Sequence, residues 1–524
     1  MKQIKLNKKT IIIALILIIL IQTMAYAIVA SNKHYIHMDE GYSYGLINYD
    51  KLDISWNEGF YNIWHDSQYY TDYLIINEEE KMDWTPVYEQ QKNDVHPPFY
   101  YFLLRIANSF SIGHFSIWPG IILNMIIHIG ITIFTYLISS KLFKNKVYGL
   151  ITALVGGLTV ATFAMVLYTR MYALAALMVL ATTYVHMINL EKDKLTIKNL
   201  VPIGICAILG SLTQYYYLIY LGIMYLVYLI RYIIKKQYKN SIRYTIAMLV
   251  SAGISLLIFP YSIAHIFIGY RGQGMFSNLT NPTFAWEGIG KYSGITIMDA
   301  FNGFLIVMFI ITLAILIYEY IKKREIKIRL TNKELGLILL PTLAYFLVIA
   351  MGTPYKEIRY LIPIIPILFI IGSYGFKIVL EKVFNKSKTN IVMALSAFII
   401  IISPVVFNLN ITYQYSDMKD IVNEMEEMHA TPALFVFNTS CNRFMDDIYL
   451  FTKLDKSYIM DSEFANKDKI KETLEQVDIT KGLILFINAN LENDDYINMI
   501  IEGTQLNTCE YMKRLNACDV YYLY

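Results

Sequence analysis

Charged residues are scarce in this sequence. Lysine, arginine, aspartate and glutamate make up 17% of the 524 residues, whereas 56% are hydrophobic. An average soluble chain carries roughly 25% charged residues, so most of this chain is expected to lie in a lipid bilayer. The net charge of +3 is small and dispersed along the chain, which argues against a nucleic-acid partner.

Cysteine is also scarce. Cys206 lies in an apolar segment, and Cys441, Cys509 and Cys518 lie near the C-terminus, where one disulfide and a leftover thiol are allowed. The sequence leaves that pairing open. No CxxC pair or Cys/His spacing of the zinc-site type occurs, which excludes a zinc site of that kind. The C-terminal region has no glycine-rich phosphate loop and no G-x-G-x-x-G motif, so it offers no nucleotide-binding signature.

Long apolar runs dominate the rest of the chain. A membrane-spanning helix needs about 20 apolar residues, and runs of that kind predict about eleven spans. They lie near residues 10–30, 117–140, 147–168, 171–190, 199–216, 217–234, 244–267, 298–320, 334–351, 359–380 and 391–408. The stretch 97–112 is also apolar, but it is short and carries Arg105. We interpret it as an amphipathic helix in the outer membrane interface.

Lysine and arginine set the orientation of the spans. The N-terminus and the loops 141–146, 191–198, 231–243, 321–333 and 381–388 are all basic, and the predicted spans place them on one face. The positive-inside rule makes that face cytoplasmic. The N-terminus is therefore predicted to be cytoplasmic in a multi-pass protein of the cell membrane. The loops 31–116, 268–297 and 352–358 and everything after residue 408 are predicted to be extracytoplasmic.

The first 30 residues have a second interpretation. The sequence AYA at 25–27 is like a signal-peptide cleavage site, but the apolar run is long and continues beyond it. We favour a retained anchor over a cleaved signal peptide. Residue 31 onward is extracytoplasmic in both cases.

A soluble α/β domain is predicted for residues 412–524, after a membrane domain at 1–411. Strand-like runs at 433–438, 482–488 and 518–524 alternate with helical patterns at 461–477 and 492–502, which indicates a small layered sheet. A lid or docking module without chemistry of its own is the interpretation we favour. A domain that recognises an acceptor is the alternative.

The long external loop 31–116 carries the most distinctive residues. Asp39 and Glu40 follow the first span, and DVHPPFYY follows at 94–101. Long external loops on a compact scaffold usually carry function. We therefore expect the active site in this loop.

Further motifs follow in order: YTRMYALAALMVL at 168–180, TQYYYLIYLG at 213–222 and RYLIPIIPILFIIGSYG at 359–375. Together with the loop motifs they resemble the GT-C superfamily of membrane glycosyltransferases. They are similar in particular to glycosyltransferase family 39, the protein O-mannosyltransferase and aminoarabinose-transferase relatives. The resemblance covers most of residues 10–380 and leaves out the C-terminal domain. Gln214 departs from it, because relatives often have histidine there.

The resemblance implies a mainly α, polytopic fold and a hexosyl- or pentosyltransferase. It further implies a polyprenyl-phosphate sugar donor, transfer on the extracytoplasmic face with inversion, and Asp39 as the general base. The chemistry of the residues agrees. A polyprenyl phosphate leaves readily and needs charge stabilisation, whereas an acceptor hydroxyl needs a base within hydrogen-bond reach. Glu40 is predicted either to position substrate or to be a solvated acid.

Asp94 and His96 are predicted to hold sugar or acceptor in the same site. Their alternative role is to start the helix that follows, with the two prolines in its first turn. No cofactor is required for the reaction, but a carboxylate and an imidazole are compatible with a divalent cation.

The donor phosphate needs cations at the outer ends of helices. Arg170, Lys356 and Arg359 satisfy that condition, and Tyr360 accompanies Arg359 in the family motif. Arginine binds phosphate through two parallel donors and lysine as a point charge; snorkelling to the interface is the alternative role. Arg271 is a weaker candidate, in the glycine-rich stretch 269–278, which we expect to be a mobile loop that closes over substrate.

A multi-pass transporter or flippase is the main alternative function. Transporters place ionisable residues at mid-bilayer depth, whereas the predicted spans have no aspartate or glutamate near their centres. Their histidines, His128, His186 and His265, are expected to be satisfied by neighbouring helices. The partners that the resemblance implies are membrane lipids, the lipid-linked donor, and a protein, glycan polymer or glycolipid as acceptor.

Overall fold

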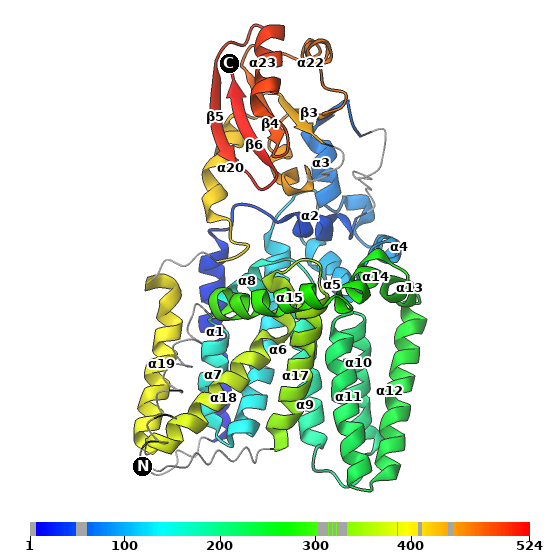
Figure 1. The fold of residues 1–524 in the computed structure, drawn as a ribbon, viewed down its shortest axis with the longest axis vertical. Coiled ribbons are helices and arrows are strands. Elements are labelled where there is room, and N and C mark those ends of the chain that lie inside the picture. The colour runs from blue at the N-terminus through cyan, green and yellow to red at the C-terminus, as the bar shows by residue number, and fades with distance from the viewer. Residues whose placement is uncertain are drawn as a thin grey trace. The chain divides into compact units, whose positions relative to one another are not determined.

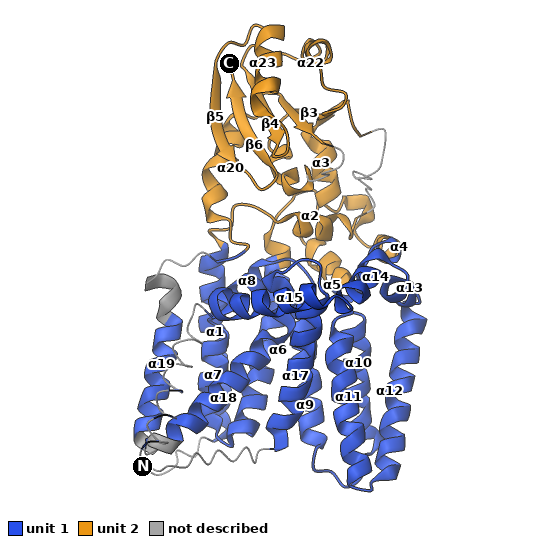
Figure 2. Ribbon diagram, viewed as in Figure 1, with its two compact units in different colours: residues 1–30, 91–100, 121–412 blue, residues 31–90, 101–120, 413–524 orange. Residues whose placement is uncertain are grey.

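The computed structural model describes residues 7–48, 60–301, 313, 317, 321, 333–384, 386–406, 411–438 and 444–524. Their contacts define two compact units (Figure 2). The helical unit comprises residues 1–30, 91–100 and 121–412, and the sheet unit comprises residues 31–90, 101–120 and 413–524. Most of the predicted external loop 31–116 thus groups with the C-terminal region.

Long apolar helices build the helical unit (Figure 1). Its elements are α1 (Lys8–Ala30), α6 (Trp118–Phe143), α7 (Lys146–Gly156), α8 (Val160–Leu167), α9 (Tyr172–Asn189), α10 (Ile197–Ser211), α11 (Tyr217–Ile234), α12 (Tyr238–Ile258), α13 (Ser262–Phe267), α14 (Tyr270–Leu279), α15 (Pro282–Ile295), η2 (Thr296–Ala300), α17 (Lys333–Gly352), η3 (Ile358–Tyr360), η4 (Ile362–Ile364), α18 (Ile365–Val383) and α19 (Lys386–Val406).

Ten of the eleven predicted spans have a counterpart among the described residues. Seven helices are long and apolar enough to cross a membrane, one bent pair matches 147–168, and two shorter apolar helices match 199–216 and 391–408. Most of the predicted span 298–320 lies outside the described residues. The chain is therefore a mainly α-helical, multi-pass membrane protein.

The predicted span 147–168 is broken rather than continuous. α7 and α8 meet at an angle of 60°, and the Thr159 side chain caps the start of α8. Gln22 of α1 donates a hydrogen bond to the Ala153 carbonyl near the end of α7, at 2.9 Å. Such partners are needed in a membrane, where water does not satisfy carbonyls freed by a break. The break directs α8 toward the turn that carries Arg170.

The glycine-rich stretch 269–278 is a helix, α14, and not the expected loop. With α15 it lies across one end of the bundle (Figure 1). Glycine disfavours helix by about 1 kcal/mol, but close packing on α17 outweighs that cost. A Cβ at Gly288 would clash with the Ala350 carbonyl oxygen, so glycine is required where α15 meets α17.

A six-stranded sheet forms the core of the sheet unit, in the order β1-β3-β2-β4-β6-β5. β2 is parallel to β3 and β4, and the other pairs are antiparallel. The strands are β1 (Trp64–Asp66), β2 (Ala433–Phe437), β3 (Lys456–Asp461), β4 (Leu483–Asn488), β5 (Cys509–Arg514) and β6 (Cys518–Leu523). The three predicted strands are confirmed as β2, β4 and β6. β1 is an edge strand that residues 64–66, from the predicted external loop, add to the C-terminal sheet.

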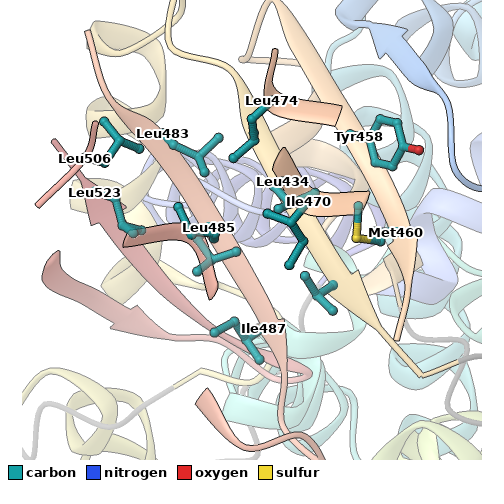
Figure 3. Packing of buried hydrophobic residues seen from close by; sticks show 12 residues of the cluster. Leu434, Tyr458, Met460, Ile470, Leu474, Leu483, Leu485, Ile487, Leu506 and Leu523 are labelled. Carbon is teal, nitrogen blue, oxygen red and sulfur yellow. The ribbon is translucent and has the colours of Figure 1, made fainter. Parts of the chain in front are cut away.

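Short helices make up the rest of the sheet unit. They are α2 (Met38–Gly45), α3 (Ser67–Leu74), η1 (Glu78–Glu80), η5 (Ser416–Met418), α20 (Lys419–Glu427), η7 (Phe444–Asp446), α21 (Ile448–Phe451), α22 (Lys467–Leu474) and α23 (Asn493–Gly503). Leucine, isoleucine and methionine side chains of the strands pack against α22 and α23 in a fully buried core (Figure 3). Cys509 and Cys518 are free thiols, and Cys441 lies outside the described residues.

Two helices, α4 (Thr85–Asn93) and α5 (Phe99–Asn108), contain residues of both units. α5 has ten residues, too few to cross a bilayer, as predicted for this stretch. Arg105 does not reach an interface, however. It is fully buried and donates hydrogen bonds to the Ile47 and Glu80 carbonyls, because a buried guanidinium needs acceptors.

Candidate active site

Asp39 lies in the first turn of the short helix α2, in the sheet unit. His37 caps this helix, and its Nδ1 atom accepts a hydrogen bond from the Asp39 amide at 3.1 Å. The same nitrogen is 3.8 Å from the Asp39 carboxylate, too far for a hydrogen bond. One-fifth of the Asp39 side chain is exposed, so an incoming hydroxyl has access to it.

Glu40, the next residue, is in a different environment. Its side chain is 1% exposed, and its Oε2 atom lies 2.9 Å from the buried ammonium group of Lys33. The same oxygen accepts a hydrogen bond from the His37 amide at 2.9 Å. Of the two adjacent carboxylates, Asp39 is thus accessible and Glu40 is buried in an ion pair.

Asp94, His96 and Arg170 meet in the helical unit. The His96 Nδ1 atom is 2.7 Å from Asp94 Oδ2, and its Nε2 atom is 3.5 Å from Arg170. Burial alone would raise the pKa of Asp94, but the charge and hydrogen bond of His96 and the charge of Arg170 outweigh burial and lower it. This carboxylate is therefore ionised at neutral pH.

Asn124 of α6 connects the turn before Arg170 to Tyr100 of the DVHPPFYY motif. Its side-chain amide donates hydrogen bonds to the Val166 and Tyr168 carbonyls, at 3.1 and 2.8 Å. Its oxygen accepts a hydrogen bond from Tyr100 at 3.2 Å. The sequence analysis missed Asn124. The signal was present, because a polar residue within an apolar span is costly and is kept for a specific contact.

Arg359, which is distant in the sequence, contacts the same turn. It donates hydrogen bonds to the Tyr168 hydroxyl at 3.3 Å and to the Glu357 carboxylate at 3.1 Å. Its exposed fraction is 8%, and that of Arg170 is 4%. The Arg359 guanidinium is thus bonded to Tyr168, and the Arg170 main-chain amide donates to the carbonyl of the same tyrosine.

Aromatic rings lie next to Arg359. The Arg359 guanidinium lies 5.3 Å from the centre of the Tyr360 ring, and Tyr172 and Tyr216 both contact Tyr360 edge to face. The charges of Arg271 and Arg359 both act on Tyr216. Arg271 of α14 therefore belongs to the same surroundings.

Lys356 occupies a separate position near the C-terminus of α17. Its ammonium group donates hydrogen bonds to the Ala350 and Thr353 carbonyls, at 2.8 and 2.7 Å, and lies 4.0 Å from the centre of the Phe284 ring. Burial, with the nearby charge of Lys291, lowers the pKa of Lys356 to about 8. In this structure Lys356 caps α17 and attaches it to α15.

An apolar cavity of about 260 Å³ lies among α10, α11, α12 and α13. Ser211, Ser255, Ser262 and Tyr215 supply its hydroxyl groups. The Tyr215 hydroxyl also bonds to His265 at 2.9 Å. The cavity is thus connected through Tyr215 to the loop that carries Asp94.

His265 links Tyr215 to the segment before Asp94. Its Nε2 atom is 3.1 Å from the Lys92 carbonyl, two residues before Asp94. His128 contacts Tyr26 and Thr132, and His186 contacts Thr182 and Tyr244. All three histidines have partners, as predicted.

Gln214 accepts a hydrogen bond from the Tyr216 amide, which fixes the loop before α11.

Within the ranges that the structure describes, no three histidine, cysteine, aspartate or glutamate side chains cluster as a metal site would need. Asp94 and His96 supply two suitable donors and are bonded to each other.

Two family models match the sequence. Residues 95–263 match the dolichyl-phosphate-mannose-protein mannosyltransferase model, and residues 296–450 match the Alg9-like mannosyltransferase model. The first range contains His96, Asn124 and Arg170, and the second contains Lys356 and Arg359. No curated protein matches the sequence significantly.

Solved structures of similar proteins include ArnT from Cupriavidus metallidurans bound to undecaprenyl phosphate. It is 11% identical, with 97% of each chain covered and a TM-score of 0.48. Another is the archaeal oligosaccharyltransferase AglB from Archaeoglobus fulgidus, in complex with an inhibitory peptide and a dolichol-phosphate. It is 12% identical, with 94% of this chain and 71% of that chain covered and a TM-score of 0.43.

The family models match the regions in which the ordered motifs lie. The predicted resemblance to membrane glycosyltransferases is therefore confirmed: two parts of the chain match families of mannosyltransferases.

Proposed function

We propose that this protein transfers a hexosyl or pentosyl group from a polyprenyl-phosphate donor to an acceptor hydroxyl on the extracytoplasmic face. The observation that carries the proposal is that two buried arginines meet at Tyr168: the Arg170 main-chain amide donates to its carbonyl, and the Arg359 guanidinium donates to its hydroxyl. A buried cationic pair of this kind is suited to a phosphate. The matched family model, which is named for dolichyl-phosphate-mannose, supports a lipid-phosphate donor.

The leaving group is the lipid phosphate. Arg170 and Arg359 stabilise the negative charge that develops on it as the bond to the sugar breaks. Arginine is favoured over lysine in this role because its planar fork engages two phosphate oxygens at once. The Tyr360 ring packs against the Arg359 guanidinium, and Tyr216 packs against Tyr360. These contacts support the orientation of Arg359.

The prenyl chain has a candidate site in the apolar cavity among α10, α11, α12 and α13. Its walls are mostly apolar, which suits a hydrocarbon chain. Tyr215 links the cavity to the loop of Asp94 through His265. A lipid bound there would have its phosphate end toward the charged cluster.

Asp39 acts as the general base in this proposal. Its carboxylate takes the proton of the acceptor hydroxyl, and the acceptor oxygen attacks the anomeric carbon. The bond from that carbon to the phosphate oxygen breaks, and the electron pair leaves with the polyprenyl phosphate. A single displacement of this kind inverts the configuration at the anomeric carbon.

The predicted sidedness is supported by an ion-pair cluster at Glu191. Arg231, Lys235 and Lys333 lie 3.1, 3.7 and 3.8 Å from its carboxylate. Three of the predicted basic loops contribute to this cluster: one supplies Glu191, the second supplies Arg231 and Lys235, and the third supplies Lys333. The fold therefore brings those loops to one end of the helical unit. We assign that end to the cytoplasm under the positive-inside rule.

The central test is Asp39→Asn, with Glu79→Gln as a control on an exposed acid of the same unit. A deletion strain is complemented with each variant, and envelope glycans and glycoproteins are compared by mass spectrometry. Loss of a general base lowers the rate by about 10²- to 10⁴-fold, so the glycan should disappear with Asp39→Asn at normal protein levels. Full activity of this variant would refute the role of Asp39.

A further inference from the structure

The segment 33–37 contacts residues 413–415 through alternate side chains. Lys33 donates a hydrogen bond to the Tyr413 carbonyl at 2.6 Å and lies 5.3 Å from the centre of the Tyr415 ring. Tyr35 contacts Tyr415 edge to face, and His37 contacts Tyr413 in the same way. All five residues belong to the sheet unit.

Both tyrosines have an unusual backbone. Tyr413 has φ of 69° and Tyr415 has φ of 54°, in the left-handed region that bulky residues rarely adopt. Such conformations persist only where surrounding contacts hold them. The bond from Lys33 and the ring contacts of Tyr35 and His37 supply those contacts.

Lys33 also contacts α2, through Glu40. Its side chain has no exposed surface, and its ammonium group lies 2.9 Å from the buried Glu40 carboxylate. Glu40 in turn accepts a hydrogen bond from the His37 amide at the start of α2. One buried ammonium group therefore joins the first turn of α2 to the strained segment 413–415.

The C-terminal part of the chain packs on the same helix. A Cβ at Gly41 of α2 would lie 3.4 Å from Met445 and 3.5 Å from Ile448. The Tyr35 hydroxyl donates a hydrogen bond to the Asp446 carbonyl at 2.7 Å. The helix that carries Asp39 is thus enclosed by residues of the C-terminal α/β region.

We propose that Lys33 is a positioning residue that clamps α2, and with it Asp39, to the C-terminal region, which serves as the scaffold of the catalytic helix. Glu40 is then the ionic partner of Lys33 and does not contact substrate. Lys33 itself acts through α2, because its buried ammonium group is inaccessible to substrate. The inference rests on the proposed role of Asp39.

The test uses the full-length protein with Lys33→Met, Lys33→Arg and Glu40→Gln. Lys81→Met is the matched control, since it removes an exposed lysine paired with Glu78 in the same unit. Transfer is measured with a synthetic polyprenyl-phosphate sugar, and kcat and donor KM are determined separately. Thermal unfolding and membrane insertion are recorded for each variant.

Small displacements of a catalytic group can cost about 10²-fold in rate. We therefore expect Lys33→Met and Glu40→Gln to lower kcat by that order, with donor KM unchanged. Lys33→Arg should restore part of the rate, because arginine keeps the charge and the donors. Lys81→Met should behave as wild type.

Two results would overturn the inference. One is wild-type kcat in a folded Lys33→Met protein. The other is a loss that Lys33→Arg does not recover and that follows the loss of thermal stability in every variant. Both leave the proposed function intact as long as Asp39→Asn remains inactive. Activity of Asp39→Asn would instead refute the proposed function.

Discussion

Arg359 donates a hydrogen bond to the hydroxyl of Tyr168, although 191 residues separate them in the sequence. This bond brings the R-Y-L motif to the turn that ends in Arg170. Two segments that were predicted as separate phosphate-binding candidates therefore lie at one place in the helical unit. The following predictions test that arrangement and the residues that hold it.

Replacing Arg359 by glutamine should lower kcat/KM for the donor by about 10- to 100-fold, because a hydrogen bond to a charged group contributes about 1.5–3 kcal/mol. Arg359→Lys should recover little, since lysine lacks the planar fork. Steady-state kinetics with a lipid-phosphate sugar measure both. Tyr168→Phe is the control, because it removes one of the bonds and keeps the charge. Equal activity of Arg359→Gln and wild type would remove Arg359 from the phosphate site.

Asn124→Leu should reduce both stability and activity. The change leaves the Val166 and Tyr168 carbonyls without their donor in a buried position, and each such group costs about 1–3 kcal/mol. The thermal unfolding midpoint in detergent and the transfer rate measure the effect. Ile126→Ala changes a side chain of the same helix that is 60% exposed and should alter neither. A stable, fully active Asn124→Leu protein would contradict the positioning role.

Lys356 should lose its charge as the pH rises through about 8, because burial and the charge of Lys291 lower its pKa to that value. The folded state then binds fewer protons than the unfolded state up to the ordinary value of 10.5, so this residue makes stability rise with pH in that window. If Lys356 also binds the donor phosphate, donor KM should increase above pH 8.

Lys356→Arg provides the comparison, since arginine stays protonated. Its donor KM should not change across pH 8. Lys291→Met should move the wild-type increase to higher pH by removing a nearby positive charge. Identical pH profiles of donor KM for wild type and Lys356→Arg would limit Lys356 to capping α17.

The contribution of Asp94 to folding stability should decrease at low pH. His96 and Arg170 lower its pKa below the ordinary value of 3.8, so its stabilising contribution is complete above that pH. The contribution is lost as the pH falls below it, through the folded-state pKa. The difference in unfolding midpoint between wild type and Asp94→Asn should therefore shrink below pH 3.8. A difference independent of pH would show that the ionised form of Asp94 has no role.

Removal of divalent cations should leave the transfer rate unchanged. Asp94 and His96, the two suitable donors, are bonded to each other at 2.7 Å, and the reaction as proposed uses arginine to neutralise the phosphate. Activity is measured before and after treatment with EDTA. Loss of activity that returns with manganese or magnesium would contradict this expectation.

Much of the site was predicted one residue at a time. Asp94 and His96 were predicted from a motif and Arg170 from its place at a helix end, and in the structure His96 contacts both of the others. Lys356 was chosen because it lies at a helix end, a criterion that does not distinguish a phosphate ligand from a helix cap. Asn124 was not predicted, because its role depends on a side-chain amide reaching two carbonyls 42 and 44 residues away in the sequence.

The sequence by itself determined that the chain lies in a membrane, where most of its spans are, and which residue types can perform the transfer. These properties follow from local composition, since about 20 apolar residues suffice to define a span. The tertiary structure alone decided that Glu40 pairs with Lys33, that α14 is a helix, and that residues 64–66 join the C-terminal sheet. Each of these depends on contacts between distant segments, which compete with local preference and leave no periodic pattern in the sequence.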